Sequence, residues 1–218
     1  MKKLIIVISL IIVIASALFC MSTRQSYTNI LSENQDKSKC PVLNINFSEA
    51  GFDEDVFETA DLVAKIKIVD NGKQMYECTY FKARVEKVYK GDIDLEKQEI
   101  GVFQDVYFST LDKEDKTLYY INMDQFNMMQ PNKEYYVVMY EKEFAQLYQE
   151  NYGVRTFTFV PDNYSLIPVE MGGLHWFEKS DLKYEDVREY PYISLTKSQS
   201  ETLEKNVKQA LKALGINS

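Results

Sequence analysis

Residue types that commonly carry catalysis are few and scattered in this sequence. The single histidine, His175, lies in the stretch Gly172-Gly-Leu-His-Trp-Phe177. A metal site or a His–carboxylate pair needs further ligands or a poised partner, so we interpret His175 as a packing residue. The sequence has no phosphate-binding glycine loop, no Gly-x-Ser-x-Gly motif and no Cys-x-x-Cys motif. We therefore predict that the protein is not an enzyme and has no catalytic residue, metal or cofactor.

Two acidic pairs, Asp53 with Asp55 and Asp112 with Asp115, offer the other conceivable chemistry. Paired carboxylates can hydrolyse glycosidic bonds or bind calcium. Neither pair has the spacing of a calcium-binding loop, and carboxylates in terminal turns and loops are usually solvated. We interpret both pairs as surface charges, with a carboxylate-dependent hydrolase as the alternative.

Two cysteines lie in the part of the chain that we expect outside the cell. Thiols oxidise there, so Cys40 and Cys78 are a possible disulfide. Such a bridge would tie the entry of the folded region to its second predicted strand and stabilise it by roughly 3–4 kcal/mol. The alternative is two unpaired thiols.

Four soft apolar side chains beside an acidic loop form a possible partner-binding surface: Met123, Phe126, Met128 and Met129. Methionine-rich clusters adapt to the shape of a partner, but they also pack under their own loops. Both interpretations stay open on the sequence alone.

Residues 1–21 are predicted to be a signal peptide or a transmembrane anchor. Two lysines precede an apolar run from Leu4 to Phe19, which predicts a cytoplasmic start and an exported remainder. Ala15-Ser16-Ala17 fits the small-x-small rule for signal peptidase, whereas an apolar run of about 17 residues is also just long enough to span a bilayer. Phe19 before Cys20 argues against a lipoprotein. The domain would thus face outside at the cell membrane, or be secreted if the segment is cleaved.

Residues 22–39 are polar and predict a flexible stalk, after which residues 40–195 carry strand patterns. Apolar residues alternate in 62–68 and again in 79–85, and Asn71-Gly72 between them predicts a hairpin turn. After Val85 the next apolar residue is Val88, which predicts a bulge that bends the hairpin as a small closed barrel requires. We expect one face in the core (Leu62, Ile66, Phe81, Val85, Val88) and the other outside (Lys65, Lys67, Lys82, Arg84).

The remaining elements follow from the same patterns. We predict a short leading helix in Asp53–Ala60, and we predict a long amphipathic helix in Thr196–Leu214, within residues 196–218, because it has a polar start, one apolar stripe and Gly215 at its end. Further strands are expected at Glu99–Asp105, Leu118–Met123 and Lys133–Tyr140, a last hairpin at Arg155–Val160 with Leu166–Val169, and a short helix at Glu143–Glu150.

Two stretches resemble a known family. Asp61-Leu-Val, followed by alternating strand residues and a long strand ending Lys87-Val-Tyr-Lys-Gly91, is similar to the N-terminal domain of tissue inhibitors of metalloproteases (TIMPs). It is more similar still to TIMP-like exported domains of Gram-positive bacteria, which also have a strand like Pro131-Asn-Lys-Glu-Tyr-Tyr-Val-Val-Met139. The resemblance implies a mainly β fold, a five-stranded OB-type (TIMP-like) barrel within residues 40–195.

The resemblance also bears on function. The resemblance implies that, in the animal family, a Cys-x-Cys motif at the start of the chain binds the protease zinc through its terminal amine and carbonyl. Here Cys40 is internal and is followed by Pro41. We therefore expect an exported, membrane-associated, non-enzymatic binding module of the cell surface, whose partner is an extracellular protein or a protease. The alternative is a metalloprotease inhibitor in the strict TIMP sense. A net charge of −8 argues against binding to nucleic acid.

Overall fold

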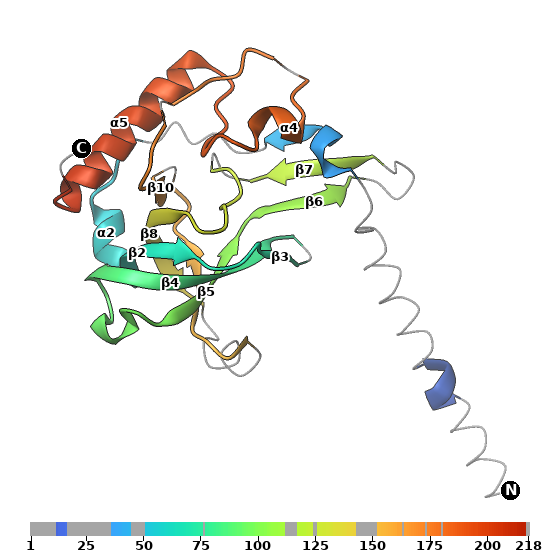
Figure 1. Cartoon of the computed structure of the whole chain (residues 1–218), viewed down its shortest axis with the longest axis horizontal. Coiled ribbons are helices and arrows are strands. Elements are labelled where there is room, and N and C mark those ends of the chain that lie inside the picture. Colours follow the sequence, from blue (N-terminus) through green and yellow to red (C-terminus); the bar gives the residue numbers. More distant parts are fainter. Residues whose placement is uncertain are drawn as a thin grey trace, which may run out of the picture.

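A closed five-stranded β-barrel forms the centre of the protein (Figure 1). The structure is a computed structural model that describes residues 12–16, 36–44, 51–75, 77–111, 117–123, 126–142, 152–162, 164–172, 174–179 and 181–216. The strands that follow one another around the barrel are β2 (Leu62–Ile68), β4 (Thr79–Lys90), β5 (Glu99–Gln104), β9 (Thr156–Phe159) and β8 (Glu134–Glu141), and β8 returns to β2. These neighbours are antiparallel except β5 and β9, which are parallel.

The predicted alternation along the first hairpin is confirmed. The side chains of Leu62, Ile66, Phe81 and Val85 are fully buried in the barrel core, and Val88 packs against that core while partly exposed. Lys82 and Arg84 are exposed, and Lys65 and Lys67 are half-buried on the same outer side. The predicted bulge is present too, because Lys65 lies opposite Lys87 while Ile66 lies opposite Val85, which leaves Glu86 without an opposite residue.

Two predicted turns are wrong. The chain does not reverse at Asn71-Gly72. Residues 69–72 form an irregular step, the short strand β3 (Lys73–Gln74) continues beside β4, and the reversal follows, where the Met75 amide donates to the Cys78 carbonyl. The Asp70 carboxylate holds the step by accepting from the amides of Gly72 (3.0 Å) and Lys82 (3.2 Å). Asn-Gly predicts a hairpin turn because both residues tolerate a positive φ, but here only Gly72 has one (+73°), and it lies in an irregular step.

The second correction concerns the strand β10 (Leu166–Pro168). It does not form a hairpin with β9. Instead both strands pair with β8 at successive places, Phe159 opposite Met139 and Leu166 opposite Val137. The Ser165 hydroxyl donates to the Val160 and Asp162 carbonyls and closes the intervening loop. β10 therefore pairs with the same edge of β8 as β9 does, and it runs in the same direction as β9.

Gly72 is the position where the irregular step requires glycine. Its φ is +73°, and an added Cβ would lie 2.4 Å from the buried ring of Phe81. We expect Gly72→Ala to lower the free energy of unfolding by about 2 kcal/mol, through both the left-handed backbone and the displaced ring. Urea denaturation checks this value. Gly51→Ala is the control, because an added Cβ there would meet nothing within 4 Å. An equal loss in both variants would contradict the assigned role of Gly72.

A second, three-stranded sheet lies beside the barrel (Figure 1). It consists of β1 (Val42–Asn44), β7 (Leu118–Asn122) and β6 (Val106–Thr110), with β1 and β7 parallel. The strand expected at Leu118–Met123 is thus confirmed as β7. The sheet packs with the helix α4 (Tyr184–Val187) and the 3-10 turn η1 (Lys37–Lys39) around a core of its own that includes Cys40, Phe108 and Tyr120. At its edge, the Gln74 side chain donates to the Phe108 carbonyl (2.6 Å) and accepts from the Phe108 amide (3.0 Å).

The predicted helices are present as α2 (Asp55–Thr59) and α5 (Lys197–Ala213), and a 3-10 turn, η2 (Ile93–Leu95), follows β4. Thr196 caps α5 by accepting from the Gln199 amide, and Gly215 follows the helix with φ +69°. Leu203 and Val207 of α5 enter the barrel core. The helix expected at Glu143–Glu150 lies outside the described residues. Among the described residues, which include only 12–16 of the apolar N-terminal segment, no helix is long and apolar enough to cross a membrane.

Candidate functional site

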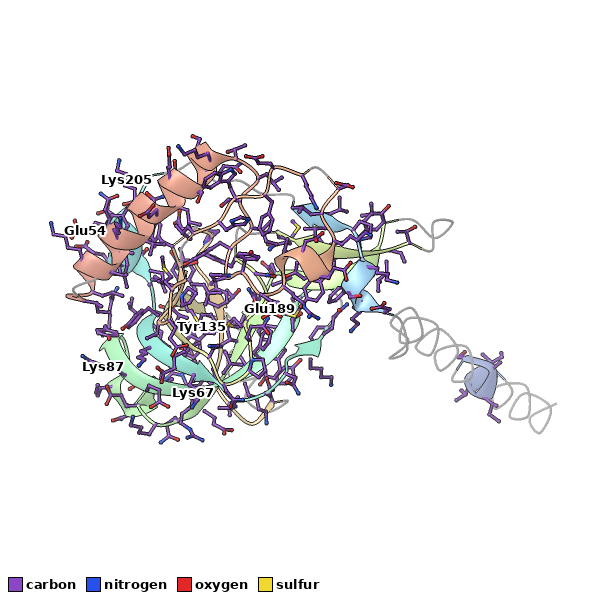
Figure 2. All side chains as sticks on the ribbon, turned by 45° about the horizontal axis from the view of Figure 1, so that its top comes forward. Glu54, Lys67, Lys87, Tyr135, Glu189 and Lys205 are labelled. Carbon is purple, nitrogen blue, oxygen red and sulfur yellow. The ribbon has the colours of Figure 1, made fainter. Side chains whose placement is uncertain are left out.

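A cleft of about 680 Å³ lies between one end of the barrel and the segment that follows α4. Lys67 of β2, Tyr135 of β8 and Glu189 beyond α4 line it from three parts of the chain. In Figure 2, Tyr135 and Glu189 lie near the centre of the view, whereas Glu54, Lys87 and Lys205 lie along the left side of the molecule. The volume lies within the range of ligand-binding sites in proteins.

The inner wall of the cleft is held by one buried side chain, Asn127. Its Nδ2 donates to the carbonyls of Val187 (2.7 Å) and Tyr190 (2.8 Å), and its Oδ1 accepts from the Tyr120 hydroxyl and the Met128 amide. Burial raises the pKa of Tyr120 well above its ordinary value. Asn127 therefore fixes the segment 187–190 against the second sheet, and the cleft is formed before any ligand arrives.

Gln104, at the end of β5, holds from behind the segment whose residues Asn127, Met128 and Gln130 form the floor of the cleft. The Gln104 side chain donates to the Asn127 carbonyl (2.8 Å) and accepts from the Met129 amide (3.0 Å). The Tyr135 hydroxyl accepts from the Gln130 amide (2.9 Å), and burial raises the pKa of Tyr135. A rigid, hydrogen-bonded floor of this kind gives a bound molecule fixed contacts.

The charges that line the cleft are balanced. Lysine and arginine contribute Lys67, Lys133 and Arg188, and glutamate contributes Glu134, Glu170 and Glu189. Most of them pair with a neighbour: Lys133 with Glu170 (3.0 Å), Arg188 with Glu189 (3.3 Å) and Glu134 with Lys65 of the outer barrel face (2.8 Å). The cleft therefore offers many polar groups with little net charge, on a protein whose net charge is −8.

Tyr190 lines the cleft and belongs to a cluster of aromatic rings beside it. The His175 ring stacks with Tyr190 (centroids 4.9 Å apart) and with Trp176 (6.3 Å), and Phe177 meets both His175 and Tyr190 edge-on. His175 itself is exposed. The predicted packing role of His175 is thus a place in a surface ring stack that supports Tyr190 at the rim of the cleft.

Most of the predicted partner-binding surface is not exposed. Phe126 and Met129 are buried in the barrel core, and Met128 is half-buried at the cleft. Only Met123 is exposed, by 36%. Phe126 packs near Phe159 and Tyr192, with ring centroids 6.2 and 6.0 Å away. The alternative, packing beneath the loop, therefore describes Phe126 and Met129, and we correct the binding interpretation for these two.

Cys40 and Cys78 are both free thiols in the structure. Cys40 is buried in the core of the second sheet, and Cys78 is half-buried at the start of β4. Burial raises the pKa of each thiol, which lowers its reactivity.

The acidic pair Asp53 and Asp55 does not line the cleft. The Asp53 carboxylate accepts from the Asp55 amide (3.0 Å), a local turn contact at the start of α2. Asp112 and Asp115 lie outside the described residues. Among the residues that are described, no group of three or more His, Cys, Asp or Glu is arranged to hold a metal ion.

Comparison of the chain with models of protein families, with curated proteins and with solved structures finds no match. The site therefore rests on its own geometry. Sequence patterns did not indicate it, because Lys67, Tyr135 and Tyr190 are ordinary strand and loop residues until the fold brings them together. The one available signal was the Gly-Gly pair before His175 and Trp176 in the sequence, which marks an aromatic segment but does not indicate what that segment contacts.

Proposed function

We propose that the protein is an exported, membrane-associated, non-enzymatic binding module of the cell surface, and that it binds its ligand in the cleft lined by Tyr135 and Tyr190. The observation that carries this proposal is the pre-formed cleft, whose walls Asn127 and Gln104 hold by buried hydrogen bonds. Binding to a rigid site loses less conformational entropy than binding to a site that must be ordered first. The sequence favours an extracellular protein or a protease as the partner, and the net charge of −8 argues against nucleic-acid binding.

We also propose that the barrel is of the OB type and TIMP-like. Its five strands and the parallel pair of the third with the fifth, β5 with β9, support an OB-type arrangement. The second function, metalloprotease inhibition in the strict TIMP sense, has less support. The Cys40 amide donates to the Lys37 carbonyl (3.2 Å), and the Cys40 carbonyl accepts from the Tyr184 amide (2.9 Å). Both groups would have to leave these bonds to bind zinc.

Export is tested by the location of the barrel and by the N-terminus of the mature protein. We expect Lys2 and Lys3 inside the cell and the barrel outside, because the positive charges precede the apolar run. Mass spectrometry of the mature protein should detect either an intact N-terminus, which means an anchor, or a start at Leu18, which means a cleaved signal. A barrel that resists protease added to intact cells would refute export.

The site itself is tested with a photo-crosslinking amino acid placed at Glu189. Illumination of intact cells should give a product heavier than the protein alone, detected by mass spectrometry, because Glu189 lines the cleft. The same residue placed at Glu54, Lys87 or Lys205 provides the controls, because these positions do not line the cleft and lie apart from Tyr135 and Glu189 in Figure 2. Equal yields at all four positions, or no product at Glu189, would contradict the proposed site.

His175 gives a check on the non-enzymatic interpretation. We expect His175→Ala to leave ligand binding within about threefold of the wild type, because Phe177 still supports Tyr190 edge-on after the substitution. Binding affinity measured by titration checks this value. Loss of a measurable catalytic activity in a folded His175→Ala protein would overturn the proposal that the module is not an enzyme.

A further inference from the structure

The chemistry of the cleft indicates which class of ligand it takes, and this inference rests on the proposed function. The main-chain groups of the wall are largely occupied. The Val187 and Tyr190 carbonyls accept from Asn127 Nδ2, and the Pro191 carbonyl accepts from the Asn127 amide (2.8 Å). An extended peptide that binds by strand addition needs a row of available N–H and C=O groups. This wall does not provide such a row.

Prolines remove further main-chain donors from the same cleft. Pro131, Pro168 and Pro191 all line it, and proline has no N–H group. Recognition therefore depends on side chains. The side chains that line the cleft include the Asn132 amide, the carboxylates of the paired glutamates, the ring of Tyr190 and the Gln130 amide, whose Nε2 also donates to the Met128 carbonyl (3.0 Å). Planar amides and carboxylates can bond to two adjacent hydroxyl groups at once.

The charge balance points the same way. The exposed pairs Lys133–Glu170 and Arg188–Glu189 cancel each other's charge at the rim, so the cleft does not select a strongly basic or acidic ligand. Tyr190 adds an aromatic ring to the lining of the cleft, and His175, outside the lining, stacks against that ring with an interplanar angle of 22°. An aromatic face carries partial negative charge, which attracts the partly positive C–H groups on one face of a sugar ring.

From these features we propose that the cleft binds a neutral oligosaccharide chain. One sugar ring packs on Tyr190 at the rim, and the hydroxyl groups of the chain bond to the side-chain amides and carboxylates along the floor. The volume of about 680 Å³ accommodates a short segment of such a chain. A polypeptide is the competing occupant, and the experiment separates the two.

The chain contains its own reporter for this test. Trp176 is the only tryptophan of the protein, and its ring lies one ring away from Tyr190 in the stack. The full-length protein, in a detergent without a sugar head group, is applied to a printed array of neutral glycans. Glycans that bind are then titrated in solution by Trp176 fluorescence and by calorimetry. A neutral peptide of glycine, serine, proline and tyrosine is titrated in parallel.

We expect a saturable fluorescence change with at least one neutral glycan and none with the peptide. Tyr190→Ala should weaken calorimetric binding about tenfold or more, whereas Tyr190→Phe, which keeps the ring, should stay within about threefold. Tyr89→Ala is the matched control, because Tyr89 is a half-buried tyrosine on β4 that does not line the cleft. It should bind as the wild type does.

The outcomes distinguish this inference from the proposed function. If no neutral glycan binds and the crosslinker at Glu189 captures a polypeptide, the oligosaccharide assignment is wrong while the cleft remains the site. If glycans bind but Tyr190→Ala and Tyr89→Ala weaken binding equally, the assignment of the ligand to this cleft is wrong. If neither glycans nor the crosslinker give a product, both proposals are wrong.

Discussion

Replacing Phe81 with alanine is expected to lower the free energy of unfolding by about 3–5 kcal/mol. The Phe81 side chain is fully buried, lies opposite Val102 of β5 and packs beside Gly72. The substitution removes a large apolar contact and leaves a cavity that the surrounding strands fill only in part, because the closed barrel restricts their movement. Such a loss is a large share of the 5–15 kcal/mol typical of a folded domain.

Urea denaturation of the purified protein measures this effect. The control is Lys82→Ala, one residue along the same strand, where the side chain is exposed on the outer face. We expect that control to stay within about 0.5 kcal/mol of the wild type. Similar losses for Phe81→Ala and Lys82→Ala would mean that the inward and outward faces of β4 are assigned wrongly.

The second large effect is expected at Asn127, on the wall of the cleft. Asn127→Ala should cost about 3–4 kcal/mol, because it leaves the buried Tyr120 hydroxyl and the carbonyls of Val187 and Tyr190 without the partner that Asn127 provides. Since these bonds also hold the wall, the variant should lose ligand binding even at temperatures where it is folded.

Hydrogen exchange separates this role from a general loss of stability. We expect the Tyr190 amide, which donates to the Val187 carbonyl, to exchange faster in Asn127→Ala while the barrel amides of β2 keep their protection. Asn132→Asp is the control, because Asn132 is exposed in the next turn and aspartate tolerates its φ of +65°. Uniform acceleration across the protein would contradict a local role for Asn127.

The sequence predicted those parts of the fold that depend on local patterns. Alternation placed Leu62, Ile66 and Phe81 in the core, and the spacing of Val85 and Val88 predicted the bulge at Glu86. The two wrong turns have a different origin. Asn71-Gly72 has a strong turn pattern, but where a chain reverses also depends on neighbouring strands, here on how residues 69–72 fit around Phe81.

The second sheet and the cleft were not predictable in this way. Val42 pairs with Tyr120, 78 positions later in the chain, and no short motif marks such a pairing. Met129 has the composition of an adaptable surface, yet it is buried because Gln104 fixes its amide at the end of the barrel. Burial of one residue by another from a distant segment is a property of the fold, and a single sequence does not contain a local signal for it.

Gln74 also has a consequence for how the protein behaves at high concentration. A strand at the edge of a sheet can template the addition of strands from other molecules, which is a route to aggregation. On β6 the Gln74 amide group satisfies both main-chain groups of Phe108, and the Thr79 hydroxyl donates to the Val106 carbonyl (2.5 Å). Side chains of β3 and β4 thus occupy the places that a foreign strand would need, so this edge of the second sheet is protected against intermolecular pairing.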